Sequence, residues 1–280
     1  MASASTREEI FAGNRAAGRI ALSVAAASGG GRGGRRARVH EEGALRVRFP
    51  NAVSGSALEA VIVNTAGGMT GGDRFAIDVA VAAGARLTVT TAAAEKMYRS
   101  LGPNSEISVK LAAGAGAALA WLPQETILFD RARARRAIDA ELAREASLVL
   151  AEAVVFGRSA MGEAVRDGRF FDRWRVRVDG ALVFAETTRL DGDIARHLAQ
   201  RAIAGGGVAI ASVLKFPDDD AAVAAVRAMA ETCAGEVAVS AWNGVALARL
   251  VAADAATLRR DLVAVLAAFG ASPLPRLWLN

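Results

Sequence analysis

Short stretches of alternating apolar and polar residues recur along the first two thirds of the chain. Leu45, Val47 and Phe49, for example, alternate with two arginines. A period of two is typical of a strand with one buried face. The same alternation recurs at 75–81, 87–91, 107–111 and 173–178, and a mainly apolar run, also typical of a strand, covers 58–63. Before Thr188 the sequence therefore predicts a body made mainly of β-strands.

Glycines separate these predicted strands, at positions 43, 55, 67, 84, 102 and 114. Such spacing is typical of an all-β sandwich, a barrel or a solenoid. No repeated motif is visible at that period, so the pattern alone does not choose among the three.

After Thr188 the pattern includes helices. Acids at 191 and 193 followed by apolar residues at helical spacing predict a helix over about 191–203. A second helix is expected to begin at 217–220 and to pack Val223 and Val226. A third, over 255–269, should be capped by Asp254 and end at Gly270. Strand-like runs at 207–214, 236–240 and 245–252 lie between them.

The N-terminal part of the chain is of low complexity. Residues 25–39 read AAASGGGRGGRRARV, a composition that favours a mobile segment. We therefore expect a mobile Gly/Arg-rich head over 1–40 and a single β-rich domain over 41–280. The first ten residues contain two glutamates and no apolar core of a secretory signal, and no window approaches the roughly 18 apolar residues of a spanning helix. A cytoplasmic protein without a membrane span is the default expectation.

The most distinctive stretch is NTAGGMTGGDRF at 64–75. Its two glycine pairs, Gly67-Gly68 and Gly71-Gly72, predict a tightly turned loop or a close approach of another segment, and composition alone favours a glycine-rich hairpin connection. A phosphate-binding P-loop is excluded because no lysine stands near these glycines.

Composition limits the chemistry that the chain can perform. The net charge of +5 is carried almost wholly by arginine, and a single tyrosine argues against a base-stacking surface. Cys233 is the only cysteine, so an internal disulfide is excluded. With His40 and His197 it makes three nitrogen or sulfur ligands, fewer than a closed zinc site needs. Any firmly held metal would depend on carboxylates or on a second chain.

No catalytic constellation can be assembled from these residues. Glu95 and Lys96 could form an acid–base pair, but neighbours in an extended chain face opposite ways, so a solvated charge cluster is the favoured interpretation. Both histidines are interpreted as structural or surface residues, and a hydrolase is not supported.

Five stretches together resemble one known family. They are NTAGGMTGGD at 64–73, TTAAAEKMYRS at 90–100, WLPQETILFD at 121–130, TRLDGDI at 188–194 and LPRLW at 274–278. In this order and spacing they are similar to the urease accessory protein D family (UreD, called UreH in some organisms), over about residues 35–280. Ala92 departs from the family, which favours glutamine there.

The resemblance implies a maturation factor rather than an enzyme. Such proteins act as a scaffold that contacts apo-urease and recruits UreF and, through it, the GTPase UreG. Together they support GTP-dependent nickel delivery, with carbon dioxide carbamylating the active-site lysine of urease. The implied fold is mainly β, a β-solenoid-like stack of strands with a few helices in the C-terminal third. An internal passage through that fold has been proposed as the nickel route.

On that basis, nickel is expected in transit, with no permanently bound cofactor and no tight metal site, because a carrier must release its ion. Sparse oxygen ligands suit such transit, and the candidates for the lining of a passage are Thr70, Asp73, Glu95, Glu125 and Asp130. The alternative interpretation is that these groups cap turns and strand ends. Arg201 and Trp278 are candidates for contact with UreF.

Two other functions were weighed against the scaffold. One is a small-molecule enzyme with a pocket at the GGMTGGD loop, which lacks a credible nucleophile, base or cofactor motif. The other is a basic nucleic-acid-binding module that uses the arginine-rich head, where no aromatic residues are interleaved with the arginines. Neither nucleic acid nor a membrane is therefore expected as a partner.

Overall fold

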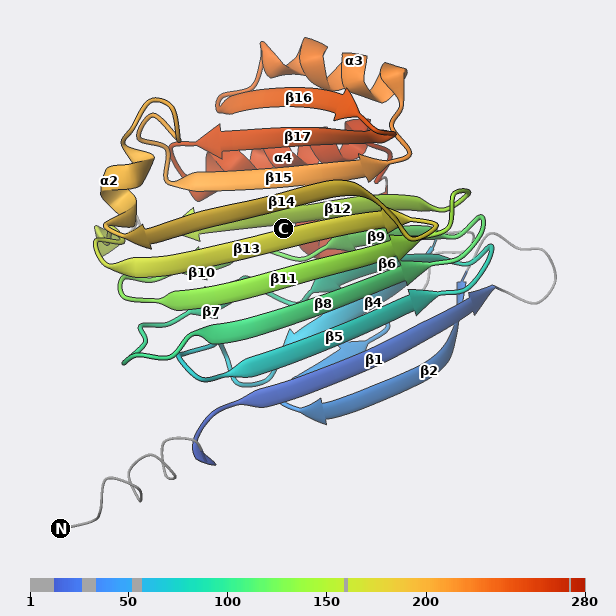
Figure 1. The fold of residues 1–280 in the computed structure, drawn as a ribbon, viewed down its shortest axis with the longest axis horizontal. Coiled ribbons are helices and arrows are strands. Elements are labelled where there is room, and N and C mark those ends of the chain that lie inside the picture. Colours follow the sequence, from blue (N-terminus) through green and yellow to red (C-terminus); the bar gives the residue numbers. More distant parts are fainter. Residues whose placement is uncertain (1–12, 27–33, 52–56, 159–160, 272, 280) are drawn as a thin grey trace.

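The computed structural model describes residues 13–26, 34–51, 57–158, 161–271 and 273–279. Two large sheets face each other (Figure 1). The strands of the first sheet follow the order β14 (Ala181–Gly192), β13 (Gly168–Val178), β11 (Arg133–Leu142), β8 (Ser105–Ala113), β5 (Arg74–Val81), β1 (Ala17–Ala26) and β2 (Gly34–Gly43). Those of the second follow the order β16 (Glu236–Trp242), β17 (Val245–Ala252), β15 (Ala209–Phe216), β12 (Ser147–Phe156), β9 (Ala118–Leu122), β6 (Arg86–Thr91), β4 (Leu58–Asn64) and β3 (Leu45–Arg48).

The chain winds between these sheets as a coil. It passes from β4 to β5, back to β6, on to β8, and so through β9, β11 and β12 to β13, and strands that neighbour each other in this stack are parallel. Two short strands, β7 (Glu95–Met97) and β10 (Thr126–Leu128), pair with each other in parallel at one end of the coil. The expectation of a β-solenoid with late helices is confirmed, and the sandwich and the barrel are excluded.

Tight turns at the other end of the coil repeat from one level to the next. In each turn the fourth residue donates its amide hydrogen to the carbonyl of the first, as in Ala85 to Ala82 (3.0 Å), Ala117 to Gly114 (2.9 Å) and Ala146 to Ala143 (2.9 Å). A buried leucine follows two residues later in every case, namely Leu87, Leu119 and Leu148. This A-x-L repeat is present in the sequence, but it is too short to have been recognised as one.

The fold begins earlier than the sequence indicated. Residues 17–26 and 34–40, expected to belong to the head, form β1 and most of β2, and β1 pairs in parallel with β5. Ile20, Leu22 and Val24 of β1 are buried in the core. The apolar alternation of residues 20–24 therefore forms a strand although a glycine-rich stretch follows it. Residues 1–12 and 27–33 lie outside the described residues.

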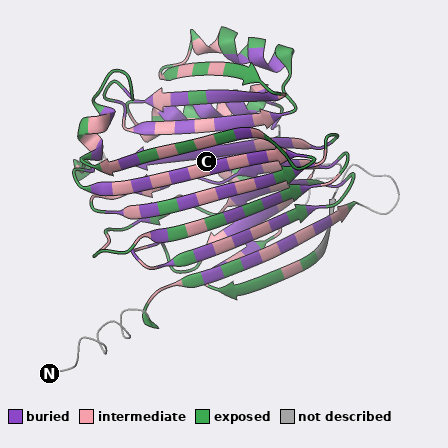
Figure 2. Cartoon of the chain, viewed as in Figure 1, coloured by how far each residue is buried: buried purple, intermediate pink, exposed green. Residues whose placement is uncertain are grey.

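Two apolar clusters stabilise the molecule. The larger lies between the two sheets, where one face of every coil strand is buried, as the alternating colours of Figure 2 show. The smaller lies on the outer face of β12, β15 and β17, against helices α3 (Asp220–Ala230) and α4 (Ala255–Ala268). In β12 the even-numbered side chains face the interior and the odd ones face the helices, which explains its nearly continuous apolar sequence.

The predicted helix caps are present. The Asp219 carboxylate accepts the amide hydrogen of Ala221 (2.9 Å), and that of Asp254 accepts from Thr257 (2.8 Å). The first helix is shorter than expected, since α2 covers only Ile194–Leu198 although Asp193 caps it. Residues 199–206 form turns that close where Gly205 and Gly206 take positive φ values of 54° and 96°. Among the described residues no helix is both long and apolar enough to span a bilayer.

Candidate functional site

The glycine-rich loop is not a hairpin connection, because it joins β4 of the second sheet to β5 of the first. It lies against the next level of the coil. Met69 is buried and pairs with Met97 of β7. Gly68 has φ +143°, and a Cβ there would collide with the Tyr98 ring and lie 2.8 Å from the Lys96 carbonyl oxygen. The loop therefore needs glycine because another segment approaches closely, as the sequence indicated.

Asp73 fixes the far side of this loop. Its carboxylate is buried and accepts amide hydrogens from Ala16 (2.8 Å) and Thr70 (2.7 Å). The Thr70 hydroxyl in turn donates to the Arg99 carbonyl (2.8 Å). Both residues hold the loop to β1 and to the β7–β8 connection.

A cavity of about 240 Å³ lies behind the loop, between the two sheets. Much of its wall is apolar and comes from core residues such as Ile77 and Val109. The polar side chains in its wall include Asn64, Glu95, Gln124, Thr126, Arg136 and Glu152. The Gln124 side chain donates no hydrogen bond within the described residues, although its Oε1 accepts from Arg259 (2.8 Å). The oxygen and nitrogen atoms of these side chains can bind water or a small hydrophilic ion in a space of this size.

Glu95 is one of two acids in the wall of this cavity, and Glu152 is the other. Burial raises the pKa of Glu95 to about 7, while the Asn64 amide, which donates to both of its carboxylate oxygens (3.0 and 3.1 Å), opposes that shift. Nearby charges add smaller effects, because Asp73 raises the pKa and Lys96 lowers it. Glu95 is thus not part of a solvated charge cluster. It faces the interior, and exposed Lys96 faces outward, as their adjacency required.

Beyond the cavity, an ion-pair chain crosses the interior from one sheet to the other. Arg136 of β11 binds Glu152 of β12 through Nη1, and binds Asp172 of β13 through Nε (3.0 Å) and Nη2 (2.6 Å). Two indole nitrogens also donate hydrogen bonds to these carboxylates, that of Trp121 to Glu152 (2.9 Å) and that of Trp174 to Asp172 (3.1 Å). We call Arg136, Glu152 and Asp172 the buried triad.

Electrostatics inside the triad favour a charged guanidinium. Burial lowers the pKa of Arg136, but the two carboxylates outweigh that effect and the net shift is upward. Burial raises the pKa of Glu152 above its usual range, although the neighbouring guanidinium acts in the opposite direction. Removing one member would leave an uncompensated charge, which is costly in an apolar interior.

A second, smaller cavity of about 30 Å³ lies on the other side of the triad. Arg136 and Glu152 line both cavities, and Asp172 lines the second. Its remaining polar lining comes from Glu186, Thr188 and Ser212, and Glu186 pairs with Arg249 (2.6 Å) near the surface. The two cavities thus follow each other along the direction in which the coil is stacked, with the triad between them.

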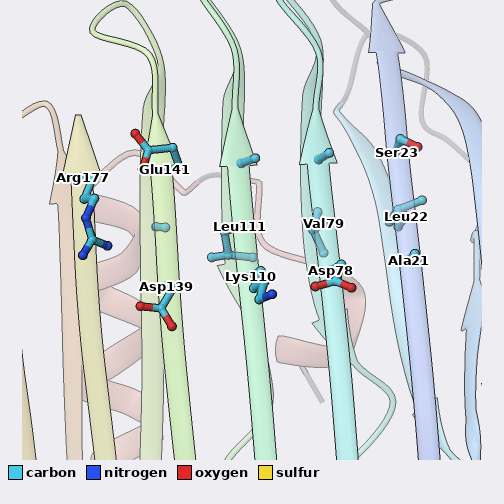
Figure 3. Close-up of a pocket in the computed structure, with 13 residues that line it drawn as sticks. Ala21, Leu22, Ser23, Asp78, Val79, Lys110, Leu111, Asp139, Glu141 and Arg177 are labelled. Atoms are coloured by element: carbon cyan, nitrogen blue, oxygen red, sulfur yellow. The ribbon is translucent and has the colours of Figure 1, made fainter. Parts of the chain in front are cut away.

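The outer face of the first sheet carries a separate, shallow depression (Figure 3). A row of charges crosses four parallel strands there, from Asp78 through Lys110 and Asp139 to Arg175. Arg19 pairs with Asp78 (3.1 Å) and Arg173 with Asp139 (2.7 Å), both at partly exposed positions. Exposed pairs of this kind contribute little to stability, so the row forms a charged surface and does not stabilise the fold appreciably.

The sequence-derived candidates lie in different places. Of the five proposed passage residues only Glu95 lines a cavity. Thr70 and Asp73 hold the loop, and Glu125 pairs with Arg259 of α4 (2.7 Å). Asp130 accepts the amide hydrogens of Arg166 (2.8 Å) and Asp167 (3.1 Å) and so orders the β12–β13 connection.

The two candidates for partner contact differ in exposure. Arg201 is exposed in the turns after α2. Trp278 of the short 3-10 helix η2 (Arg276–Trp278) is 2% exposed and donates through Nε1 to the Leu122 carbonyl (3.0 Å). Trp278 therefore packs the C-terminal segment onto the body.

The buried triad was not predicted from the sequence. Glu152 was the readable signal, because it is the one charged residue in the strand SLVLAEAVVF. Within the described residues, no three His, Cys, Asp or Glu side chains come close enough to form a metal site.

These features define a class: a β-solenoid protein with a glycine-rich loop and, behind it, internal cavities whose walls include several polar side chains. A family model described as UreD urease accessory protein matches residues 16–279. Urease accessory protein UreD of Rhodopseudomonas palustris strain HaA2 is 56% identical over 271 residues, which are 97% of this chain and 96% of that protein. Urease accessory protein UreD of Bradyrhizobium diazoefficiens is 55% identical over 276 residues, covering 99% and 98%. The chain belongs to the UreD family of urease accessory proteins, which take part in urease maturation.

Proposed function

We propose that this chain is the scaffold of a urease-maturation complex. In this role it binds apo-urease, recruits UreF and, through UreF, the GTPase UreG, and lets nickel pass through its interior. Family membership supports the part in urease maturation. The internal cavities, with polar side chains in their walls, support the interior route.

The position of Glu95 in the cavity wall is the main support for the nickel route. Glu95 lines the larger cavity, burial raises its pKa to about 7, and Asn64 orients it. A carboxylate with few oxygen or nitrogen neighbours binds a divalent cation weakly, which suits an ion that must move on. Glu95 would hold nickel in its ionised form and release it to the next site.

The route is tested by blocking the cavity. Ala94 lines it beside Glu95, so Ala94→Trp should obstruct it by bulk, whereas Glu95→Gln should remove the charge at constant size. Ala83→Trp, in an exposed turn at the other end of the coil, is the matched control. All three variants should assemble with UreF and urease.

The measurement is nickel per active site in urease purified after activation with each variant. Ala94→Trp and Glu95→Gln should lower it, and Ala83→Trp should not. Normal nickel content with both cavity variants, in complexes that assemble normally, would rule out this cavity as the route.

A further inference from the structure

The buried triad stands where the two cavities meet. Arg136 and Glu152 line the 240 Å³ cavity and the 30 Å³ cavity alike. Asp172 lines the smaller cavity alone. The triad therefore lies where a cation that moved from one cavity to the other would meet it.

The charges of the triad are matched to a cation. The side chains of Arg136, Glu152 and Asp172 are 7%, 4% and 9% exposed. Water therefore solvates these charges little, and they stabilise one another. Two buried carboxylates on facing strands need a positive charge between them. In this structure the guanidinium supplies it.

The carboxylates are also held independently of Arg136. Trp121 donates to Oε1 of Glu152 and Trp174 donates to Oδ2 of Asp172. If the guanidinium moved away, these indole hydrogen bonds would keep both carboxylates aimed at the same space. The Thr126 hydroxyl, 3.4 Å from Nη1 of Arg136, adds a further oxygen there. Hard oxygen donors of this kind suit a divalent cation.

We propose that Glu152 and Asp172 form a divalent-cation subsite whose place is held by the Arg136 guanidinium until a cation displaces it. Arg136 is thus an internal counter-ion and the gate of the passage. The adjoining larger cavity offers the displaced side chain space, and Glu95 on its wall offers it a carboxylate. The inference rests on the proposed nickel passage, but it concerns a binding site that can be measured without urease.

The subsite is tested with Arg136→Gln and with Mn²⁺ as the probe, because bound Mn²⁺ is counted by its paramagnetic signal. The full-length variant should bind about one Mn²⁺ per chain, at least about tenfold more tightly than the unsubstituted protein. Adding Glu152→Gln and Asp172→Asn should abolish this binding.

Arg259→Gln is the matched control. It breaks another arginine–glutamate pair, with Glu125, but Arg259 lines neither cavity. It should gain no Mn²⁺ binding.

Loss of folding is also informative. If Arg136→Gln folds only with Mn²⁺ present, and Arg259→Gln shows no such dependence, the proposal is supported. The proposal is overturned if the folded Arg136→Gln protein binds Mn²⁺ no better than the unsubstituted chain, or if it fails to fold with Mn²⁺ present. Nickel content of urease with Ala94→Trp tests the passage separately, so failure of the route and failure of the subsite are distinguishable.

Discussion

The Asn64 side chain donates hydrogen bonds from Nδ2 to both carboxylate oxygens of Glu95, at 3.0 and 3.1 Å, and to the Gly68 carbonyl at 3.2 Å. The Asn64 amide thus connects the glycine-rich loop to Glu95 in the cavity wall. The position of Glu95 depends on the shape of the loop, so the loop and the proposed passage form one structural unit.

Glu95 should make stability depend on pH. Its pKa rises from 4.5 to about 7 on folding, so between these values the folded state binds more protons than the unfolded state. Stability should therefore fall as pH rises from 4.5 to 7, by up to about 3 kcal/mol at higher pH. Glu95→Gln should remove this loss. The check is the difference in unfolding free energy between the unsubstituted chain and Glu95→Gln, measured across pH 4.5 to 8. A difference that does not change with pH would contradict the prediction.

The loop should respond very differently to alanine at its first two glycines. Gly68→Ala places a methyl group against the Tyr98 ring and the Lys96 carbonyl, so it should cost more than about 2 kcal/mol of unfolding free energy. Gly67→Ala, at φ +74° with open space around it, should cost about 1 kcal/mol. Denaturant unfolding of both variants gives the comparison. Equal costs would show that backbone strain, and not the close approach, explains the glycines.

Local pattern was sufficient to predict much of the fold. Alternation identified β5 and β13, and Asp254 marked the beginning of α4, because these depend on residues close in sequence. The winding of the chain as a solenoid was expected only from the family resemblance, since pairing between levels is a long-range property.

The site was less predictable for the same reason. Asn64 and Glu95 are 31 residues apart and meet only because successive levels of the coil stack. Arg136 follows an arginine at 135, so alternation could not tell which of the two faces the interior. The pairing of Glu95 with Lys96 in sequence also suggested solvation, although the cavity that buries Glu95 is built from the strands β3 to β12 and the loops between them.

The turns after α2 give the last prediction, which concerns the proposed UreF contact. Arg201 is exposed there and Ile203 is 46% exposed, an apolar side chain beside a cation that is typical of an interaction surface. Arg201→Glu should weaken binding of UreF at least about tenfold, because a like-charge or desolvated acid replaces a cation at the interface.

Arg227→Glu, on the exposed face of α3, is a matched charge reversal away from these turns. Affinity is measured by titrating UreF onto each folded variant. If both variants bind UreF as the unsubstituted chain does, the contact lies elsewhere, and if both bind weakly to the same degree, net charge rather than Arg201 governs the association.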